Sequence, residues 1–148
     1  QLGSETDTLD TEGQVIKIAK VKPFSVEKII NILNTFLGET SQIPPMYSAL
    51  KVNGKPLYKL AREGKVIERQ ARKITISEIE LLDSNKDSLK IRVRCGRGTY
   101  IRVLASDIAT SMDTVGFLTS LVRTKVGDFN KEDSMSVENV AEWLSATA

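Results

Sequence analysis

Histidine is absent from this 148-residue chain, and cysteine occurs once, at Cys95. A disulfide within the chain is therefore excluded, and a zinc site built from thiolates and imidazoles lacks its ligands. No apolar run approaches the roughly 20 residues that cross a bilayer, and no apolar signal segment opens the chain. Cys95 lies on the apolar face of an alternating stretch, which favours a buried structural thiol over a nucleophile. We expect no metal site and no membrane segment.

Basic residues are unevenly distributed, although the formal net charge is only +2. Residues 51–73 hold eight Lys or Arg against two Glu, whereas residues 1–14 carry acids and no base. Such segregated charge indicates an anion-binding surface, although a solvated helix face is the commoner outcome for a basic run. Helical spacing predicts a basic and an apolar face here, and two tyrosines add surface on which a nucleic-acid base could stack. The residues concerned are Lys55, Lys59 and Arg62 on the basic face, Leu57, Leu60 and Ala61 on the apolar face, and Tyr47 and Tyr58.

The segment 89–102 predicts a strand, a glycine turn and a helix start. Residues 89–95 alternate between apolar and basic side chains, Gly96 and Gly98 end the strand, and an apolar run with helical spacing follows. Thr99 is an acceptable N-cap, which places Arg102 at the third helical position. A cation in the first turn opposes the helix dipole at a cost of about 0.3–1 kcal/mol. Either Arg102 is simply solvated, or it grips an anion with its planar fork.

The rest of the chain indicates an α+β order without repeats. A helix begins after its N-cap Ser25 and stops at Gly38, and a hairpin joins residues 74–82 to residues 89–95. Out-of-phase apolar pairs predict a bulge near Ser77-Glu78 in this hairpin. The further expected elements are a strand over 15–20, a loop over 39–54 with a tight turn at Asn53-Gly54, a basic helix ending at Gly64, a strand over 125–129, and a last helix capped by Ser136.

Four stretches together resemble the TruB-type tRNA pseudouridine synthases, in the same order along the chain. The most specific is Arg97-Gly98-Thr99-Tyr100-Ile101-Arg102, followed by Leu104-Ala105 and Asp107. The other three are Leu2-Gly3, Thr6-Asp7-Thr8, Asp10 and Gly13; then Gln42, Pro44-Pro45, Tyr47-Ser48-Ala49, Lys51, Gly54, Tyr58, Ala61-Arg62-Glu63-Gly64, Arg69 and Arg72; and finally Leu121, Arg123-Thr124, Val126-Gly127 and Phe129.

The resemblance implies a mixed, mainly antiparallel sheet with flanking helices and a cleft across its middle. It also implies a cytoplasmic isomerase that needs no cofactor or metal and converts uridine 55 in the T-loop of tRNA to pseudouridine. The target base would be flipped out of the loop, while the insertion over 39–73 grips the RNA backbone. The insertion residues that we expect to contact the tRNA T-stem-loop are Tyr47, Lys51, Lys55, Tyr58, Lys59, Arg62, Arg69 and Arg72.

Three positions take a role in the site from the resemblance. Arg102 matches the family arginine that pairs with the nucleophilic Asp and keeps that carboxylate ionised. Tyr100 and Leu121 match positions that line the base pocket, although plain core is the favoured interpretation of Leu121 from the sequence alone. Asp7 and Asp10 lie in a Thr- and Gly-rich stretch, where acidic residues usually form turns, and we assign them no catalytic role.

One departure from the family concerns the nucleophile itself. The family Asp belongs to a Gly-Gly-Leu-Asp-Pro-type motif with a His shortly before it, and this chain has neither. We therefore interpret residues 1–148 as the C-terminal part of a catalytic domain, without the small C-terminal RNA-binding domain of many relatives, and expect the chain alone to be inactive. A complementary chain could carry the N-terminal half with the Asp. The alternatives are a catalytically inactive RNA-binding module and a structural module whose basic helix is merely solvated.

Overall fold

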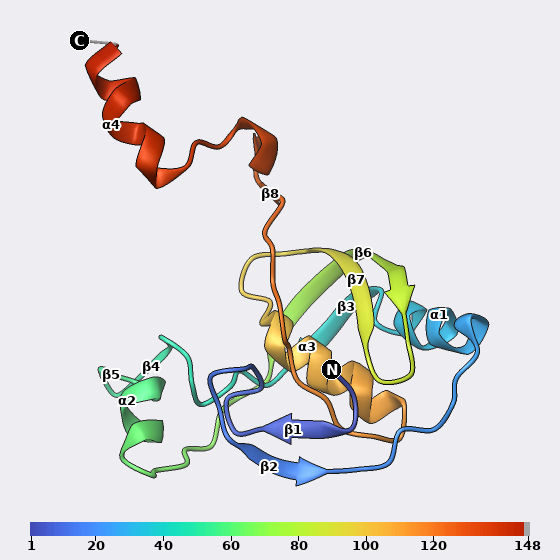
Figure 1. Cartoon of the computed structure of the whole chain (residues 1–148). Helices are drawn as coiled ribbons and strands as arrows, with labels where there is room; N and C mark the ends of the chain where they lie inside the picture. Colours follow the sequence, from blue (N-terminus) through green and yellow to red (C-terminus); the bar gives the residue numbers. More distant parts are fainter. Residues whose placement is uncertain (147–148) are drawn as a thin grey trace.

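The computed structural model describes residues 1–146, without the side chains of 141–143 and 146 (Figure 1). The fold is α+β, as the sequence predicts. Its strands are β1 (Ser4–Thr6), β2 (Val15–Ile18), β3 (Gly38–Gln42), β4 (Lys51–Val52), β5 (Lys55–Pro56), β6 (Arg72–Ser84), β7 (Leu89–Cys95), β8 (Lys125–Val126) and β9 (Phe129–Asn130). Its helices are α1 (Val26–Asn34), α2 (Leu57–Arg62), α3 (Ile101–Ser111) and α4 (Val137–Ala146), with a 3₁₀ turn, η1 (Lys131–Asp133).

An antiparallel sheet in the order β3-β6-β7 forms the centre of the fold. The predicted hairpin between β6 and β7 is confirmed, and so is the bulge, because the pairing register shifts between Ile76 and Glu78. Ser77 lies in this bulge and donates its hydroxyl to the Arg94 carbonyl at 3.1 Å. The bulge also accounts for the change of phase in the apolar pattern, since one extra residue moves the following side chains to the other face.

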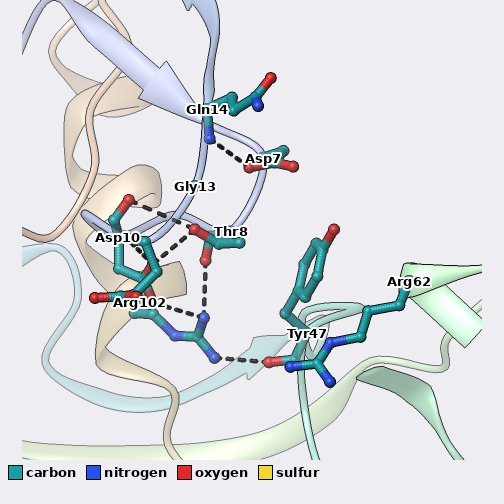
Figure 2. A pocket seen from close by; sticks show the side chains of 9 residues that line it. Asp7, Thr8, Asp10, Gly13, Gln14, Tyr47, Arg62 and Arg102 are labelled. Atoms are coloured by element: carbon teal, nitrogen blue, oxygen red, sulfur yellow. Dashed lines mark hydrogen bonds and ion pairs between the residues drawn. The ribbon is translucent and has the colours of Figure 1, made fainter. Parts of the chain in front are cut away.

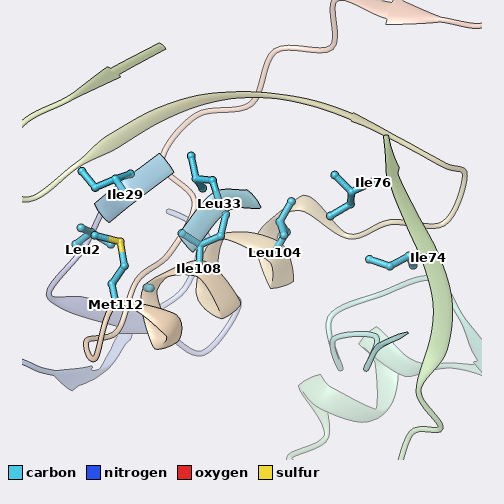
Figure 3. Close-up of a cluster of buried hydrophobic side chains, with 9 residues drawn as sticks. Leu2, Ile29, Leu33, Ile74, Ile76, Leu104, Ile108 and Met112 are labelled. Carbon is cyan, nitrogen blue, oxygen red and sulfur yellow. The ribbon is translucent and has the colours of Figure 1, made fainter. Parts of the chain in front are cut away.

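Helices α1 and α3 pack with this sheet around one hydrophobic core (Figure 3). Ser25 caps α1 as predicted, because its hydroxyl accepts a hydrogen bond from the Lys28 amide at 3.2 Å. Cys95 packs against the core but is half-buried rather than buried. Truncating a fully buried aliphatic residue here would cost about 2–5 kcal/mol. The buried members are Leu2, Ile29, Leu33, Ile74, Ile76, Leu104, Ile108, Ala109 and Met112.

Four secondary-structure predictions need correction. Helix α1 ends at Asn34, and Gly38, with a φ of +93°, begins strand β3 within the predicted loop. Strand β3 reads Gly-Glu-Thr-Ser-Gln and has no apolar alternation, so its pairing with β6 leaves no signal in its own sequence. Lys55 lies in β5 rather than on α2, and the strand predicted over 125–129 is a hairpin of β8 and β9 around Gly127. The tight turn at Asn53-Gly54 is confirmed by positive φ at both residues.

The N-terminal residues pair with the segment that follows α3. Strand β1 pairs with β2, Leu2 forms an antiparallel bridge with Gly116, and Asp10 forms a parallel bridge with Leu118. Gly116 has to be small, because a Cβ there would lie 2.7 Å from both the Ala109 Cβ and the Gln1 carbonyl oxygen. These bridges bring the loop over 7–13 and the segment over 116–121 to the start of α3.

Figure 1 shows the segment from β8 to α4 leaving the body of the fold. Among residues 1–146, no helix is both long and apolar enough to span a bilayer.

Candidate active site

Arg102 lies in the first turn of α3 as predicted, but it is the second residue of the helix instead of the third. Tyr100 is the N-cap, with φ −90° and ψ 105°, and its side chain makes no capping hydrogen bond. The Thr99 hydroxyl instead donates to the Gly96 carbonyl at 2.9 Å, which stabilises the glycine turn. Arg102 is therefore the second helical residue, and its charge still opposes the helix dipole.

Three acceptors hold the Arg102 guanidinium (Figure 2). Nη1 donates to the Thr8 carbonyl and to the Asp10 carboxylate, both at 2.9 Å, and Nη2 donates to the Tyr47 carbonyl at 2.7 Å. The side chains of Arg102 and Asp10 are each only 23% exposed. Arg102 is thus not a solvated residue, and its first anionic partner lies within this chain.

The guanidinium retains unused donors. An arginine has five N–H groups, and the three bonds above use two on Nη1 and one on Nη2. Its Nε–H and one Nη2–H therefore have no partner among the described residues. Arg102 can accept a second carboxylate without giving up Asp10.

Asp10 has two functions, of which the sequence predicted one. Its Oδ1 accepts the Thr8 hydroxyl at 2.6 Å and the Glu12 amide at 3.1 Å, so it does form a turn. Partial burial works to raise the pKa of Asp10, but these two hydrogen bonds and the Arg102 charge outweigh it and lower that pKa. The carboxylate is ionised at neutral pH and neutralises Arg102.

The ion pair could have been anticipated from two features of the sequence considered together. One is a cation placed against a helix dipole, and the other is an acidic stretch, residues 1–14, that contains no base. Each feature needs a charge of the opposite sign. Because Asp10 and Arg102 are 92 residues apart in the chain, local sequence patterns do not connect them.

Gly13 keeps this acidic loop closed. The Asp7 carboxylate accepts the Gln14 amide at 2.9 Å across the loop. A Cβ at Gly13 would collide with Asp7 Oδ1 and Thr8 Oγ1, and it would lie 2.8 Å from the Thr8 amide nitrogen. Any larger residue at this position would displace Thr8, whose carbonyl binds Arg102 and whose hydroxyl bonds the Asp10 carboxylate.

Two open cavities meet at Arg102. The first has a volume of about 550 Å³ and includes Tyr47 and Arg62 from the basic insertion. The second, of about 510 Å³, is lined by Tyr100, Leu121 and Arg123. Asp10, Glu12 and Arg102 line both. Each cavity is within the size range of small-molecule and cofactor sites.

The second cavity brings together the three residues that the resemblance selected for the pocket, namely Arg102, Tyr100 and Leu121. Leu121 is 57% exposed, so the interpretation of this residue as plain core is wrong. An exposed leucine beside a tyrosine and an arginine gives the cavity an apolar wall, a ring and a hydroxyl, and a cation.

The basic insertion contributes to the site at only two of its predicted positions. Tyr47 and Arg62 line the first cavity, and the Arg62 guanidinium lies 5.5 Å from the centre of the Tyr58 ring. Leu57 and Leu60 are buried, which confirms the apolar face of α2. The remaining predicted contacts line neither cavity: Lys51, Lys55, Lys59 and Arg72 are exposed, and Tyr58 and Arg69 are half-buried.

The sequence of this chain is similar to those of known proteins. The family model described as "TruB family pseudouridylate synthase (N terminal domain)" matches residues 1–101. A tRNA pseudouridine synthase B from Francisella philomiragia is 52% identical over 143 residues, and one from Francisella tularensis subsp. tularensis is 50% identical. Each alignment covers 96% of this chain and 47% of the relative, so the chain spans about half the length of these curated relatives.

A solved structure gives the same result for the fold. In the crystal structure of a Cbf5-Nop10-Gar1 complex, one chain superimposes with a TM-score of 0.66 and 26% identity, over 84% of this chain and 33% of that one. The fold and the matched residues both indicate one family. The chain belongs to the TruB family of pseudouridylate synthases.

Proposed function

We propose that this chain is the part of a tRNA pseudouridine synthase that binds the target nucleotide and orients the nucleophile. The observation that carries the proposal is Arg102, which is held by three acceptors at the junction of two cavities and still has two N–H groups to offer. The names of the relatives support tRNA as the substrate, and uridine 55 in the T-loop as the target follows from the family resemblance. A tRNA substrate favours a cytoplasmic location.

In the proposed reaction Arg102 binds the nucleophilic carboxylate through those two free donors. A guanidinium at hydrogen-bond distance favours the ionised form of a carboxyl group, which is the form that attacks the nucleoside. The bond between the ribose C1′ and the base nitrogen N1 breaks, and C1′ then bonds to C5 of the same base. The carboxylate is released unchanged, C5 loses its proton and N1 gains one, so that the product is an isomer of the substrate. Tyr100 and Leu121 pack against the flipped base and limit how it reorients between these steps.

The basic insertion supplies affinity for the RNA. Lys51, Lys55 and Lys59 are exposed and lie outside both cavities, which suits contacts to phosphates rather than to the reacting base. The Arg62 guanidinium lies over the Tyr58 ring, and the two groups offer surfaces on which an unstacked base could pack. Phosphate contacts fix the orientation of the RNA, so the cavity receives the target nucleotide in one register.

We further propose that strand β2 packs against the polypeptide that carries the nucleophilic Asp. Val15, Ile16 and Ile18 are 56%, 63% and 81% exposed, on a strand that pairs with β1 alone among the described residues. A two-stranded sheet with exposed apolar side chains is marginally stable in water, and covering it would stabilise the fold. The relatives contain a further half that this chain does not match, which is consistent with such a segment.

The test is tritium release from tRNA labelled with 5-tritiated uridine. The chain alone should release no tritium, and adding a fragment that bears the family Asp motif should start release. The matched control is the same fragment with that Asp changed to Asn. Turnover by the isolated chain, or by the mixture with the Asn fragment, would contradict the proposal. If the chain mixed with the unchanged Asp fragment binds RNA but shows no turnover, the chain is a catalytically inactive RNA-binding module.

A further inference from the structure

Gln42 holds the backbone of Tyr100 through both ends of its side-chain amide. Its Oε1 accepts the Tyr100 amide at 2.8 Å, and its Nε2 donates to the Tyr100 carbonyl at 3.2 Å. The chemistry fixes this orientation, because the backbone N–H can only donate and the carbonyl can only accept. Gln42 is 4% exposed and is the last residue of β3. One buried side chain thus pairs with Tyr100 as a neighbouring strand would.

The position of Tyr100 depends on this pairing. Tyr100 lies two residues after Gly98, whose φ is +88°, and it precedes the first turn of α3 without a side-chain cap. Its carbonyl accepts the first helical hydrogen bond, from the Leu104 amide at 3.0 Å, as well as the bond from Gln42. Its N–H is too early in the chain to bond within the helix, so Gln42 supplies its acceptor.

The same short segment also holds Arg102. Tyr47 lies five residues after Gln42, and its carbonyl accepts the Arg102 Nη2 at 2.7 Å. Three hydrogen bonds therefore run from residues 42–47 to residues 100–102, which line the second cavity. The base of the insertion forms part of the support of the site.

We propose that Gln42 is a positioning residue that fixes Tyr100, and with it the start of α3, in the geometry that the cavity needs. It touches neither the base nor the nucleophile and acts through Tyr100. This inference rests on the proposed function for its consequence in catalysis, whereas the placement of Tyr100 can be measured independently.

The first measurement uses Gln42→Glu in the chain reconstituted with the Asp-bearing fragment. An ionised carboxylate still accepts the Tyr100 N–H but repels the Tyr100 carbonyl, whereas a protonated carboxyl has the shape and donor of the amide. The single-turnover rate relative to wild type should be about 10- to 100-fold lower at pH 8 and should recover as pH falls, with Kd for a T-stem-loop RNA within about twofold. Asn31→Asp, the same change from amide to carboxylate at an exposed position of α1 outside the insertion and both cavities, should show a ratio near one at every pH.

A ratio for Gln42→Glu that stays near one at pH 8 would overturn the inference. So would a loss of rate that does not recover at low pH although the variant remains folded by circular dichroism, since the protonated isostere should restore both bonds.

The second measurement needs no activity. In the isolated chain, Gln42→Ala should remove the hydrogen-exchange protection of the Tyr100 amide while the amides of β6 keep theirs. Unchanged protection at Tyr100 would overturn the inference. Absence of turnover in the wild-type mixture would reject the proposed function instead, and the two failures are therefore distinguishable.

Discussion

Replacing Asp10 with Asn should destabilise the fold in a manner that depends on pH. All the groups that face the Asp10 carboxylate are donors: Arg102 at Oδ2, and the Thr8 hydroxyl and the Glu12 amide at Oδ1. An Asn side chain has to turn its NH₂ group toward one of these donors in either orientation. The substitution therefore removes a charge and also leaves at least one donor opposed.

The magnitude follows from the burial of the pair. Exposed ion pairs contribute about 0–1 kcal/mol, whereas removing one partner of a fully buried pair costs about 3–5 kcal/mol. With both side chains 23% exposed, Asp10→Asn should cost about 1–3 kcal/mol at pH 7. The folded-state pKa of Asp10 is lowered, so its contribution is fully present above the unfolded pKa of about 3.9 and is lost as pH falls through the folded value. The difference between wild type and variant should shrink below about pH 4.

Urea unfolding at pH 7 and at pH 3 measures this difference. The matched control is Asp113→Asn, because Asp113 pairs with Lys22 at 3.3 Å but with side chains 73% and 66% exposed. The control should change the free energy of unfolding by less than about 0.5 kcal/mol at either pH. An Asp10→Asn variant as stable as the control at pH 7, or one equally destabilised at both pH values, would refute the reasoning.

Three further predictions concern the site and its RNA-binding surface. Arg102→Lys replaces a guanidinium that bonds through two nitrogens with a single ammonium group. Turnover in the reconstituted enzyme should fall strongly, while Kd for the T-stem-loop stays nearly constant. A parallel loss of affinity and salt dependence would indicate a phosphate contact instead. Lys55→Ala and Lys59→Ala should each lower the slope of log K against log salt by about one unit in fluorescence titrations, and an unchanged slope would identify a solvated face. Gly13→Ala should lower the thermal midpoint by several degrees through its collision with Asp7 and Thr8, whereas Gly96→Ala, where a Cβ meets nothing closer than 3.7 Å, should be tolerated; equal midpoints would contradict the assigned role of Gly13.

The elements that the sequence predicted correctly are those whose apolar and polar residues alternate with the period of the element. The hairpin of β6 and β7 shows a period of two with one change of phase, and the structure has two strands with a register shift at that point. A second register shift, between Leu81 and Asp83, was not predicted. Helix α1 shows a capping Ser25 and an apolar stripe. In both cases half of the element faces the core, and a change from core to solvent every few residues is visible in the sequence.

Strand β3 was missed for the opposite reason. Its residues Gly-Glu-Thr-Ser-Gln face mostly solvent, and its pairing with β6 is made by backbone groups that every sequence has. Only Gln42, at its end, is buried, and a single glutamine does not predict burial. Edge strands of this kind are specified by the strand they join, here the apolar β6, rather than by themselves.

The resemblance predicted which residues belong to the site, and the helix dipole indicated that Arg102 needs an anion. Neither predicted the hydrogen bonds that hold Arg102 in place. Tyr100, Arg102 and Leu121 do line one cavity, whereas the contacts that hold Arg102 come from loops 55 and more residues away. Two of its three acceptors are backbone carbonyls, of Thr8 and Tyr47, and side-chain identity carries no information about them.

The placement of Arg102 against the dipole of α3 becomes reasonable once Asp10 is included. The N-terminal end of a helix favours negative charge by the same 0.3–1 kcal/mol, roughly, that it disfavours positive charge. The bond to Arg102 holds Asp10 at this end of α3. The helix dipole therefore stabilises the acid while it opposes the base, and its net interaction with the ion pair is close to zero. A second carboxylate that used the free Nε–H would then meet a helix end that favours it as well as a guanidinium. Under the proposed function, Arg102 would then bridge two acids, Asp10 and the nucleophile, and a Lys at the same position, with no second edge, could not replace it.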